Sequence, residues 1–346
     1  MNSKLTLALA LLGLIFEIVF GHGDHGDAES LFQWTTIDYN WPTRAARDTA
    51  ISTRKYVPLN NAINGIRVYD NKIFVTVPRF GDGVPSTLNT LINAHPQKRF
   101  LTSRTVLQPY PRWDMQKEGN CTAFQKVQNI EIVSWTDFKV LNDVVHVTNG
   151  VNGIAISANF DYVYYSPIAG TALYQIPTKI LRNASSDFSA HVRKVGDKPS
   201  QGDGMIMSTK NSLYFSVLAK NAVAMWELHR DIEKYGSEGK VMMDTLTYEA
   251  NDPTMEWVDS LALDSFGYLW FTTSRLQLYL NKQLTNDSIN FRIWRAFVHE
   301  PSYAYFDSRT RSESNHIHSH NSSSNIESHT FVHFALFALL IMLKVL

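Results

Sequence analysis

Cysteine is nearly absent from this sequence, because Cys121 is the only one among 346 residues. The chain therefore has no internal disulfide and no C-x-x-C redox or zinc motif. Net charge is also absent, since 32 basic side chains balance 32 acidic ones. Without a long-range electrostatic field, the sequence gives no reason to expect nucleic acid as a partner.

Enzyme signatures are missing as well. The sequence has no G-x-S-x-G or H-E-x-x-H motif, and GHGDHG at 21–26 matches G-x-G-x-x-G without a strand before it or a helix after it. Histidine-rich clusters that would hold a metal only loosely occur in both tails, at His22, Asp24 and His25 and at His316, His318 and His320. We predict no metal and no cofactor.

The N-terminus has the pattern of a processed leader. Lys4 precedes a hydrophobic run from Leu5 to Phe20, and Val19 and Gly21 fit a cleavage site after Gly21. Glu17 disfavours the alternative, a stable membrane anchor. We predict a signal peptide at 1–21, a flexible segment at 22–30 and a secreted protein. N-x-[ST] sequons, which mark glycosylation in secreted proteins, occur at Asn120, Asn183, Asn286 and Asn321.

The C-terminus combines a polar stretch at 307–330 with a hydrophobic tail at 331–346. The tail is shorter than the ~20 residues of a membrane-spanning helix. Small residues from Asn321 to Ser323, a polar spacer and a terminal hydrophobic run resemble a glycolipid-anchor signal. A weak tail anchor and a divergent end with no anchoring role are the alternatives.

Helical periodicity is scarce, and the segments that share a pattern are strand-like. A short apolar strand, a polar turn and an aromatic strand recur at 64–78, 152–176, 203–228 and 259–280, and in the last three we expect a third strand to follow. Gly153 and Gly204 are 51 residues apart, and Gly204 and Ser260 are 56 apart. A period near 50 favours a β-propeller over the alternative, a β-sandwich.

One interval departs from this period. Gly65 and Gly153 are 88 residues apart, which is too long for one blade and too short for two. We therefore predict an all-β domain at 31–306, a β-propeller with five or an incomplete six blades. In its first blade, KIFVTVPRFGDGVP at 72–85 ends a strand at Pro78, and glycines 81 and 83 permit a sharp turn after Arg79.

The blade sequences resemble the yellow / major royal jelly protein family of insects. The resemblance rests on Trp34, on Asp38-Tyr39, on Asn60-Asn61, on FVTVPR at 74–79, on GVP at 83–85 and on TLN at 87–89. It continues in YPRWDMQKEGNC at 110–121, LAKNAVAMWE at 218–227 and WVDSLALDSFGYLWFTTSRLQ at 257–277. The family pattern implies a six-bladed propeller and a further blade with more cysteines after residue 121. Its absence here would explain both the long interval and the unpaired Cys121.

The resemblance also implies a small aromatic amine or catechol as the ligand, bound in the propeller channel, and a role in melanin formation and cuticle pigmentation. The positions that match the family motifs are Asn221, Ser260, Ser274 and Leu276 for ligand binding. Each also has a structural interpretation, as a turn or strand residue. The sequence does not fix the oligomeric state.

Three functions therefore stay open. The first is a secreted binding protein of pigmentation. The second is an enzyme that converts dopachrome, with Asp259 as the base and Arg79 and Arg275 as electrostatic partners. The third is a structural, nutritive or non-functional product, because a propeller that lacks a blade exposes strand edges.

Overall fold

The structure is a computed structural model that describes residues 28–69, 72–91, 107–109, 136–140, 142–147, 151–183 and 189–303. The predicted signal peptide, the polar segment at 307–330 and the hydrophobic tail lie outside these residues, as do Cys121, Asn120, Asn321 and both histidine clusters. No helix within the described ranges is long and apolar enough to cross a bilayer.

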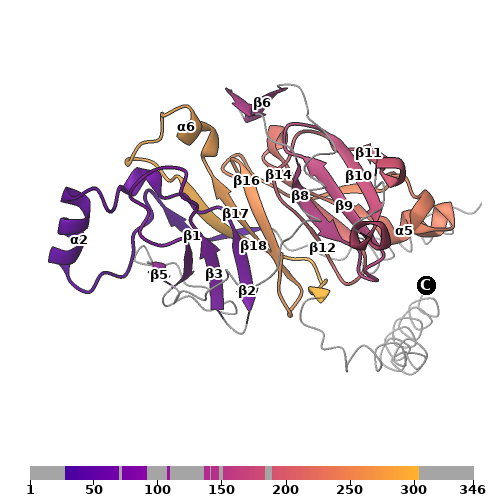
Figure 1. Ribbon diagram of the computed structural model, residues 1–346, viewed down its shortest axis with the longest axis horizontal. Coiled ribbons are helices and arrows are strands. Elements are labelled where there is room, and N and C mark those ends of the chain that lie inside the picture. Colours follow the sequence, from indigo (N-terminus) through magenta and orange to yellow (C-terminus); the bar gives the residue numbers. More distant parts are fainter. Residues whose placement is uncertain are drawn as a thin grey trace, which may run out of the picture. The chain divides into compact units, whose positions relative to one another are not determined.

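The described strands form four antiparallel sheets of four strands each, which are the blades of a β-propeller (Figure 1). Blade A contains β2 (Ile66–Tyr69), β3 (Lys72–Thr76), β4 (Leu88–Leu91) and β5 (Leu107–Pro109). Blade B contains β8 (Val151–Ile156), β9 (Tyr162–Pro167), β10 (Ala172–Pro177) and β11 (Arg193–Asp197). Blade C contains β12 (Met205–Met207), β13 (Ser212–Val217), β14 (Ala222–Glu227) and β15 (Leu246–Asn251). Blade D contains β16 (Val258–Leu263), β17 (Tyr268–Ser274), β18 (Phe291–Phe297) and β1 (Glu29–Trp34).

Short helices and one hairpin connect these blades. The hairpin consists of β6 (Thr136–Val140) and β7 (Asp143–Val147). The α-helices are α2 (Arg44–Ser52), α4 (Thr178–Arg182), α5 (Leu228–Tyr235) and α6 (Leu276–Leu280). The 3-10 helices are η1 (Pro58–Asn60), η3 (Ser189–His191), η4 (Leu218–Lys220) and η5 (Glu238–Lys240).

The first strands of the blades are the inner strands. β12 packs beside β8 on one side and β16 on the other, and β16 packs beside β2. The blades therefore follow the order B, C, D, A. This is the radial arrangement of a propeller, in which each blade's first strand lines the central channel.

Blade D joins the two ends of the described region. β1 supplies its outer strand by pairing with β18, with Glu29 opposite Arg295 and Trp34 opposite Phe291. Arg295 also forms an ion pair with Glu29 and lies over the rings of Tyr268 and Trp270, at 4.5 and 5.4 Å from their centroids. This closure holds the N-terminal strand in the sheet.

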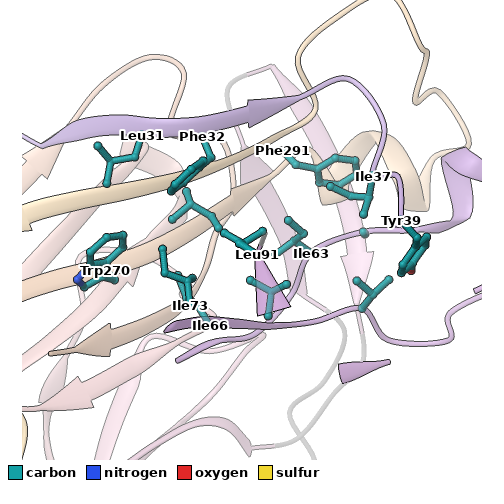
Figure 2. Close-up of a cluster of buried hydrophobic side chains, with 14 of the residues drawn as sticks. Leu31, Phe32, Ile37, Tyr39, Ile63, Ile66, Ile73, Leu91, Trp270 and Phe291 are labelled. Atoms are coloured by element: carbon teal, nitrogen blue, oxygen red, sulfur yellow. The ribbon is translucent and has the colours of Figure 1, made fainter. Parts of the chain in front are cut away.

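A large apolar cluster of the described residues lies between blades A and D (Figure 2). Ile66 and Ile73 of blade A lie beside Trp270 of blade D, and Phe32 of β1 belongs to the same cluster. The alternating burial of β2 and β3 follows from the two-residue period of a strand, which turns every second side chain toward the neighbouring blade.

Residues of two family motifs, Asn60-Asn61 and the segment at 257–277, form hydrogen bonds that stabilise turns of the blades. The amide groups of Asn60 and Asn61 hold the turn after β3, by donating to the carbonyl oxygens of Asp82 at 2.8 Å and of Gly83 at 3.1 Å. Gly83 has a left-handed φ of 76°, so the turn requires glycine there. In blade D, the carboxylate of Asp264 accepts hydrogen bonds from the backbone of the β16–β17 turn and from Trp270 Nε1 at 2.9 Å.

The four predicted repeats coincide with blades A to D, and the prediction of a β-propeller is confirmed. One detail was wrong. The third strand expected within 259–280 is instead α6, and the third strand of blade D is β18, further along the chain. Leu276 and Gln277 are buried apolar and amide contacts of a helical turn rather than alternating strand residues. In the long interval after blade A, the described residues form one hairpin, β6–β7.

Candidate functional site

Four polar residues occupy equivalent places at the entrances of the inner strands. Asn64 precedes β2, Asn152 lies at the start of β8, Asp203 precedes β12 and Asp259 lies at the start of β16. We call these four residues the channel quartet. The residue after each one is Gly65, Gly153, Gly204 or Ser260, the same positions that set the repeat period.

Glycine follows the quartet residue where two inner strands come very close. A Cβ on Gly204 would lie 2.2 Å from the backbone oxygen of Asp259, and a Cβ on Gly153 would lie 3.0 Å from the backbone oxygen of Asp203. No side chain fits at Gly204, because contacts under 3 Å require the backbone to move. The missing side chain is what brings Asp203 and Asp259 together.

Hydrogen bonds link the quartet in pairs across the blades. Nδ2 of Asn64 donates to both carboxylate oxygens of Asp259, at 2.8 and 2.7 Å. Asn152 Nδ2 donates to Oδ1 of Asp203, and Trp257 Nε1 donates to its Oδ2 at 2.9 Å. Each carboxylate therefore accepts a hydrogen bond from the asparagine of one neighbouring blade. On its opposite side lies the blade that carries the second carboxylate.

Both carboxyl groups are buried, with 6% of Asp203 and 5% of Asp259 exposed. Burial raises the pKa of Asp203 to about 6, against the opposing hydrogen bond from Trp257 and the positive charge of Lys198. Burial also raises the pKa of Asp259 well above its usual range, and the negative charge of Asp203 adds to this effect. The pair thus favours a proton or another positive charge between blades C and D.

A buried amine lies near Asp203, one member of this pair. Lys198 is 3% exposed, and its Nζ donates to the backbone oxygen of Gly202 at 3.4 Å. Burial lowers the pKa of Lys198 to about 7, although the charge of Asp203 opposes the shift. The constellation therefore combines two carboxyl groups with one amine.

A cavity of about 210 Å³ opens on the quartet. Its polar lining comes from the four quartet residues and Ser260, and its apolar lining includes Ile154, Met205 and Leu261. Ligand pockets of about 300 Å³ and more take drug-sized molecules, so this cavity suits a smaller ligand. Its chemistry is amphipathic, with a carboxylate end and an apolar wall.

An apolar cluster covers the adjoining loops of blades B, C and D. It contains Ile168 and Ala169 after β9, Leu218 of η4, Trp257, Leu276 of α6, and Val140 and Val145 of the β6–β7 hairpin. The hairpin is fixed there, because β6 packs on η4 and β7 on α6. Trp257 joins this cluster to the carboxylates through its hydrogen bond to Asp203.

The predicted residues divide between this site and its surroundings. Asp259 and Ser260 line the cavity, and Ser260 Oγ accepts from the backbone of Ile66 at 3.3 Å. Leu276 is buried in the apolar cluster and Ser274 is buried at the end of β17, where its N–H bonds to Trp257. Asn221 lies elsewhere, in the β13–β14 turn, with a left-handed φ of 47°.

The two predicted arginines do not line the cavity. Arg79 is exposed in the loop after β3. Arg275 forms an ion pair with Glu256 at 3.2 Å and donates to Ser288 Oγ at 3.0 Å. Of the three residues predicted to act together in catalysis, the structure therefore places only Asp259 at the channel. The sequons at Asn183 and Asn286 are both exposed.

Sequence reasoning missed Asn64, Asn152, Asp203 and Lys198. The first three were detectable as the polar residue before the periodic glycine, a position shared with Asp259. Within the described residues, no group of three or more histidine, cysteine or acidic side chains is arranged to hold a metal.

A larger depression of about 480 Å³ lies on blade C, lined by residues 248–252 with Ala28 and Met255. We prefer the channel cavity as the candidate site, because two buried carboxyl groups from different blades converge there. The depression on blade C lies along the outer strand β15.

The sequence of this chain is similar to that of one known protein family. The family described as Major royal jelly protein matches residues 126–302, just over half of the chain. Major royal jelly protein 1 of Apis mellifera is 20% identical over 418 positions, covering 85% of this chain and 93% of the relative. Protein yellow of Drosophila melanogaster is 38% identical over 90 residues, 26% of this chain but only 16% of that protein.

The alignment with Major royal jelly protein 1 is longer than the part of this chain that it includes. It spreads 85% of this chain's 346 residues, about 294, over 418 positions, so roughly 120 positions of the relative have no counterpart here.

Solved structures share only a distant likeness. A luciferin-regenerating enzyme has a TM-score of 0.32 at 14% identity, covering 70% of this chain and 64% of that chain. The calcium-binding protein regucalcin from Agrobacterium tumefaciens has a TM-score of 0.30 at 12% identity, covering 70% and 78%. Likeness at this level does not extend to activity. The match to the family model covers more than half of the chain, and it shows that this chain belongs to the major royal jelly protein family.

Proposed function

We propose that this protein binds a small aromatic amine at the channel quartet. The observation that carries the proposal is the pairing of Asp203 and Asp259 from neighbouring blades beside a small amphipathic cavity. An ammonium group at this point would satisfy the excess negative charge, and the ring would contact Ile154, Met205 and Leu261.

The volume of the cavity supports a ligand of one ring and a short side chain. A phenethylamine has both features, and its amine stays protonated at neutral pH because its pKa is close to that of lysine. The oxygen atoms of Asn64, Asn152 and Ser260 provide further polar contacts for ring hydroxyl groups.

Titration calorimetry with tyramine tests the proposal directly. We expect one-site binding to the wild-type protein and at least a tenfold loss in Asp259→Asn, because a hydrogen bond to a charged group contributes about 1.5–3 kcal/mol. Asp48→Asn, on the exposed face of α2, is the matched control and should bind like the wild type. 4-Ethylphenol, which lacks the amine, should bind weakly.

Equal tyramine affinity in Asp259→Asn and the wild type would contradict the proposal, as would a folded wild-type protein that binds no amine. Thermal unfolding reads out folding and binding together, because a ligand that binds the native state raises the unfolding midpoint.

Following the family resemblance, we extend the proposal to a secreted protein of cuticle pigmentation whose ligand is an amine of the melanin pathway. Silencing of its transcript during cuticle formation should alter pigmentation. Unchanged pigment after complete silencing would contradict this wider role but not the binding site.

Dopachrome conversion is the second candidate, favoured by one observation. A buried carboxyl group with a raised pKa, as at Asp259, is a stronger base than an exposed aspartate. The enzyme would accelerate loss of dopachrome absorbance, and Asp259→Asn would abolish this acceleration. Tyramine binding without any acceleration would leave the protein as a binding protein.

A further inference from the structure

The buried amine of Lys198 has no role in the proposed binding of an amine, and a positive charge there at first disfavours such a ligand. Its side chain is almost fully buried and donates to a neutral acceptor, the backbone oxygen of Gly202. Burying a lysine is costly unless a nearby negative charge offsets it. Here that charge is Asp203.

Lys198 is held in place behind the cavity lining, on the segment that leads to Asp203. Its backbone N–H donates to Thr171 O at 2.8 Å. The loop that follows is held on blade C by Asp203 N–H, which donates to Ser216 Oγ at 2.6 Å, and by Leu218 N–H, which donates to Gln201 O at 3.1 Å. A Cβ on Gly202 would lie 2.1 Å from the backbone oxygen of Ser216, so the loop packs closely against β13 and requires glycine there.

The charges of the site can therefore be counted. The ionisable groups are Asp203 before β12, Asp259 on β16 and Lys198 after β11, and the facing side chains of Asn64, Asn152 and Trp257 are neutral. When a bound cation favours ionisation of both carboxyl groups, two carboxylates and one ammonium leave a single negative charge. One unit of positive charge on a ligand completes the balance.

Without Lys198, the same residues would suit a different ligand. Two carboxylates and two amide oxygens are hard oxygen donors of the kind that bind Ca²⁺. A fixed ammonium beside them repels a divalent cation about twice as strongly as a monovalent one, because the Coulomb energy scales with the charge of the ion.

We propose that Lys198 is a specificity-determining residue, which limits the channel site to ligands with one positive charge and excludes divalent cations. The inference rests on the proposed function, since it concerns the same site. It assigns the ligand class as organic monoamines rather than divalent metal ions.

The test compares tyramine and Ca²⁺ on the full-length wild-type protein and on Lys198→Met by titration calorimetry at pH 6.5. In the wild type we expect tyramine binding that millimolar Ca²⁺ does not displace. In Lys198→Met we expect Ca²⁺ affinity to rise at least about tenfold, because a buried positive charge is lost. Lys198→Arg keeps the charge and should behave like the wild type.

A second pair of variants serves if Lys198→Met does not fold. Asp203→Asn brings the site to zero net charge, so tyramine affinity should fall at least about tenfold. Adding Lys198→Met to Asp203→Asn returns the site to one negative charge and should restore the affinity. If Lys198 had only a structural role, the double variant would lose more tyramine affinity than Asp203→Asn alone, and no rescue would be seen.

The outcomes separate the two proposals. Tyramine binding to the wild type with unchanged Ca²⁺ affinity in Lys198→Met, or with no rescue in the double variant, overturns the inference and leaves the proposed function standing. Ca²⁺ that displaces tyramine from the wild type also overturns the inference. Absence of tyramine binding to a folded wild-type protein overturns both.

Discussion

The contacts between neighbouring inner strands follow one backbone plan but differ in chemistry. Blades B and C meet through Asn152 and Asp203, and blades D and A meet through Asp259 and Asn64, each pair an amide with a carboxylate. Blades C and D meet where Asp203 and Asp259 face each other. In the first two contacts, the amide of one blade donates a hydrogen bond to the carboxylate of the next. In the third contact, two carboxyl groups face each other, and a positive charge from another group is needed to stabilise both as carboxylates.

The first two contacts stabilise the packing of neighbouring blades, whereas the third does not. An amide that donates to a carboxylate joins two blades at little cost. Two buried carboxylates oppose each other, which weakens the contact between blades C and D. Sites at which a local rule is broken are where ligand binding is expected.

The largest effect is expected from breaking the close approach between blades C and D. Gly204→Ala would place a Cβ 2.2 Å from the backbone oxygen of Asp259. We expect a loss of at least about 3 kcal/mol in the free energy of unfolding, the upper end for overpacking, measured by urea unfolding.

Two matched variants sharpen this prediction. Gly153→Ala, between blades B and C, would meet the flexible end of Met205 at 2.7 Å and a backbone oxygen only at 3.0 Å, so its loss should be smaller. Gly170→Ala has no neighbour nearer than 3.6 Å and should be close to neutral. Equal losses at 153 and 204 would contradict the distinction between the two contacts.

The next effect is a pH dependence specific to the carboxylate pair. Because the pKa of Asp203 is raised from 3.8 to about 6 in the folded protein, the folded state binds more protons than the unfolded state between these values. The protonated Asp203 therefore contributes to the free energy of unfolding in full below pH 4. This contribution, on the order of 2 to 3 kcal/mol, is lost as the pH rises to about 6. Asp203→Asn should flatten this decline in unfolding curves measured from pH 4 to pH 7.

Lys198 acts in the opposite direction and at higher pH. Its pKa is lowered to about 7, so the unfolded state binds more protons between pH 7 and the ordinary pKa of 10.5. Stability from this group therefore rises with pH across that window. Lys198→Met should remove the rise, and its persistence in that variant would assign it to other groups.

The smallest effect concerns the outer parts of the same contacts. Tyr164 donates to Glu238 at 2.9 Å between blades B and C, and Tyr214 donates to Glu300 at 3.0 Å between blades C and D. Tyr164→Phe and Tyr214→Phe should each lower the free energy of unfolding by about 1–2 kcal/mol. Similar losses would mean that the B–C and C–D contacts differ only near the channel. A much larger loss for one tyrosine would mean that the two contacts also differ in their outer parts.

The blades were predictable from sequence because their signal is local. An apolar strand, a polar turn and an aromatic strand follow one another within each repeat, and the period marks the glycine that permits the close approach of inner strands. The family motifs were equally visible, and the structure shows several of them to be locks, as at Asn60, Asn61 and Asp264.

The site was only partly predictable because it is assembled from four blades. Asp259 and Ser260 were found through a motif, but Asn152 and Asp203 have no local signal apart from preceding a glycine. Lys198 is an ordinary surface residue by type, and only burial gives it a role. The segment at α6 was misassigned for a related reason, since Leu276 packs against residues of the β6–β7 hairpin that are distant in sequence.

The pairing of β1 with β18 has a consequence for the time course of synthesis. Residue 29 leaves the ribosome long before residue 297, by roughly 15 to 50 seconds at ordinary rates of translation. During that interval β1 has no partner strand, while the described blades A, B and C can already form. Completion of blade D is therefore the last step, and any delay there leaves an apolar edge strand open to pairing with other chains.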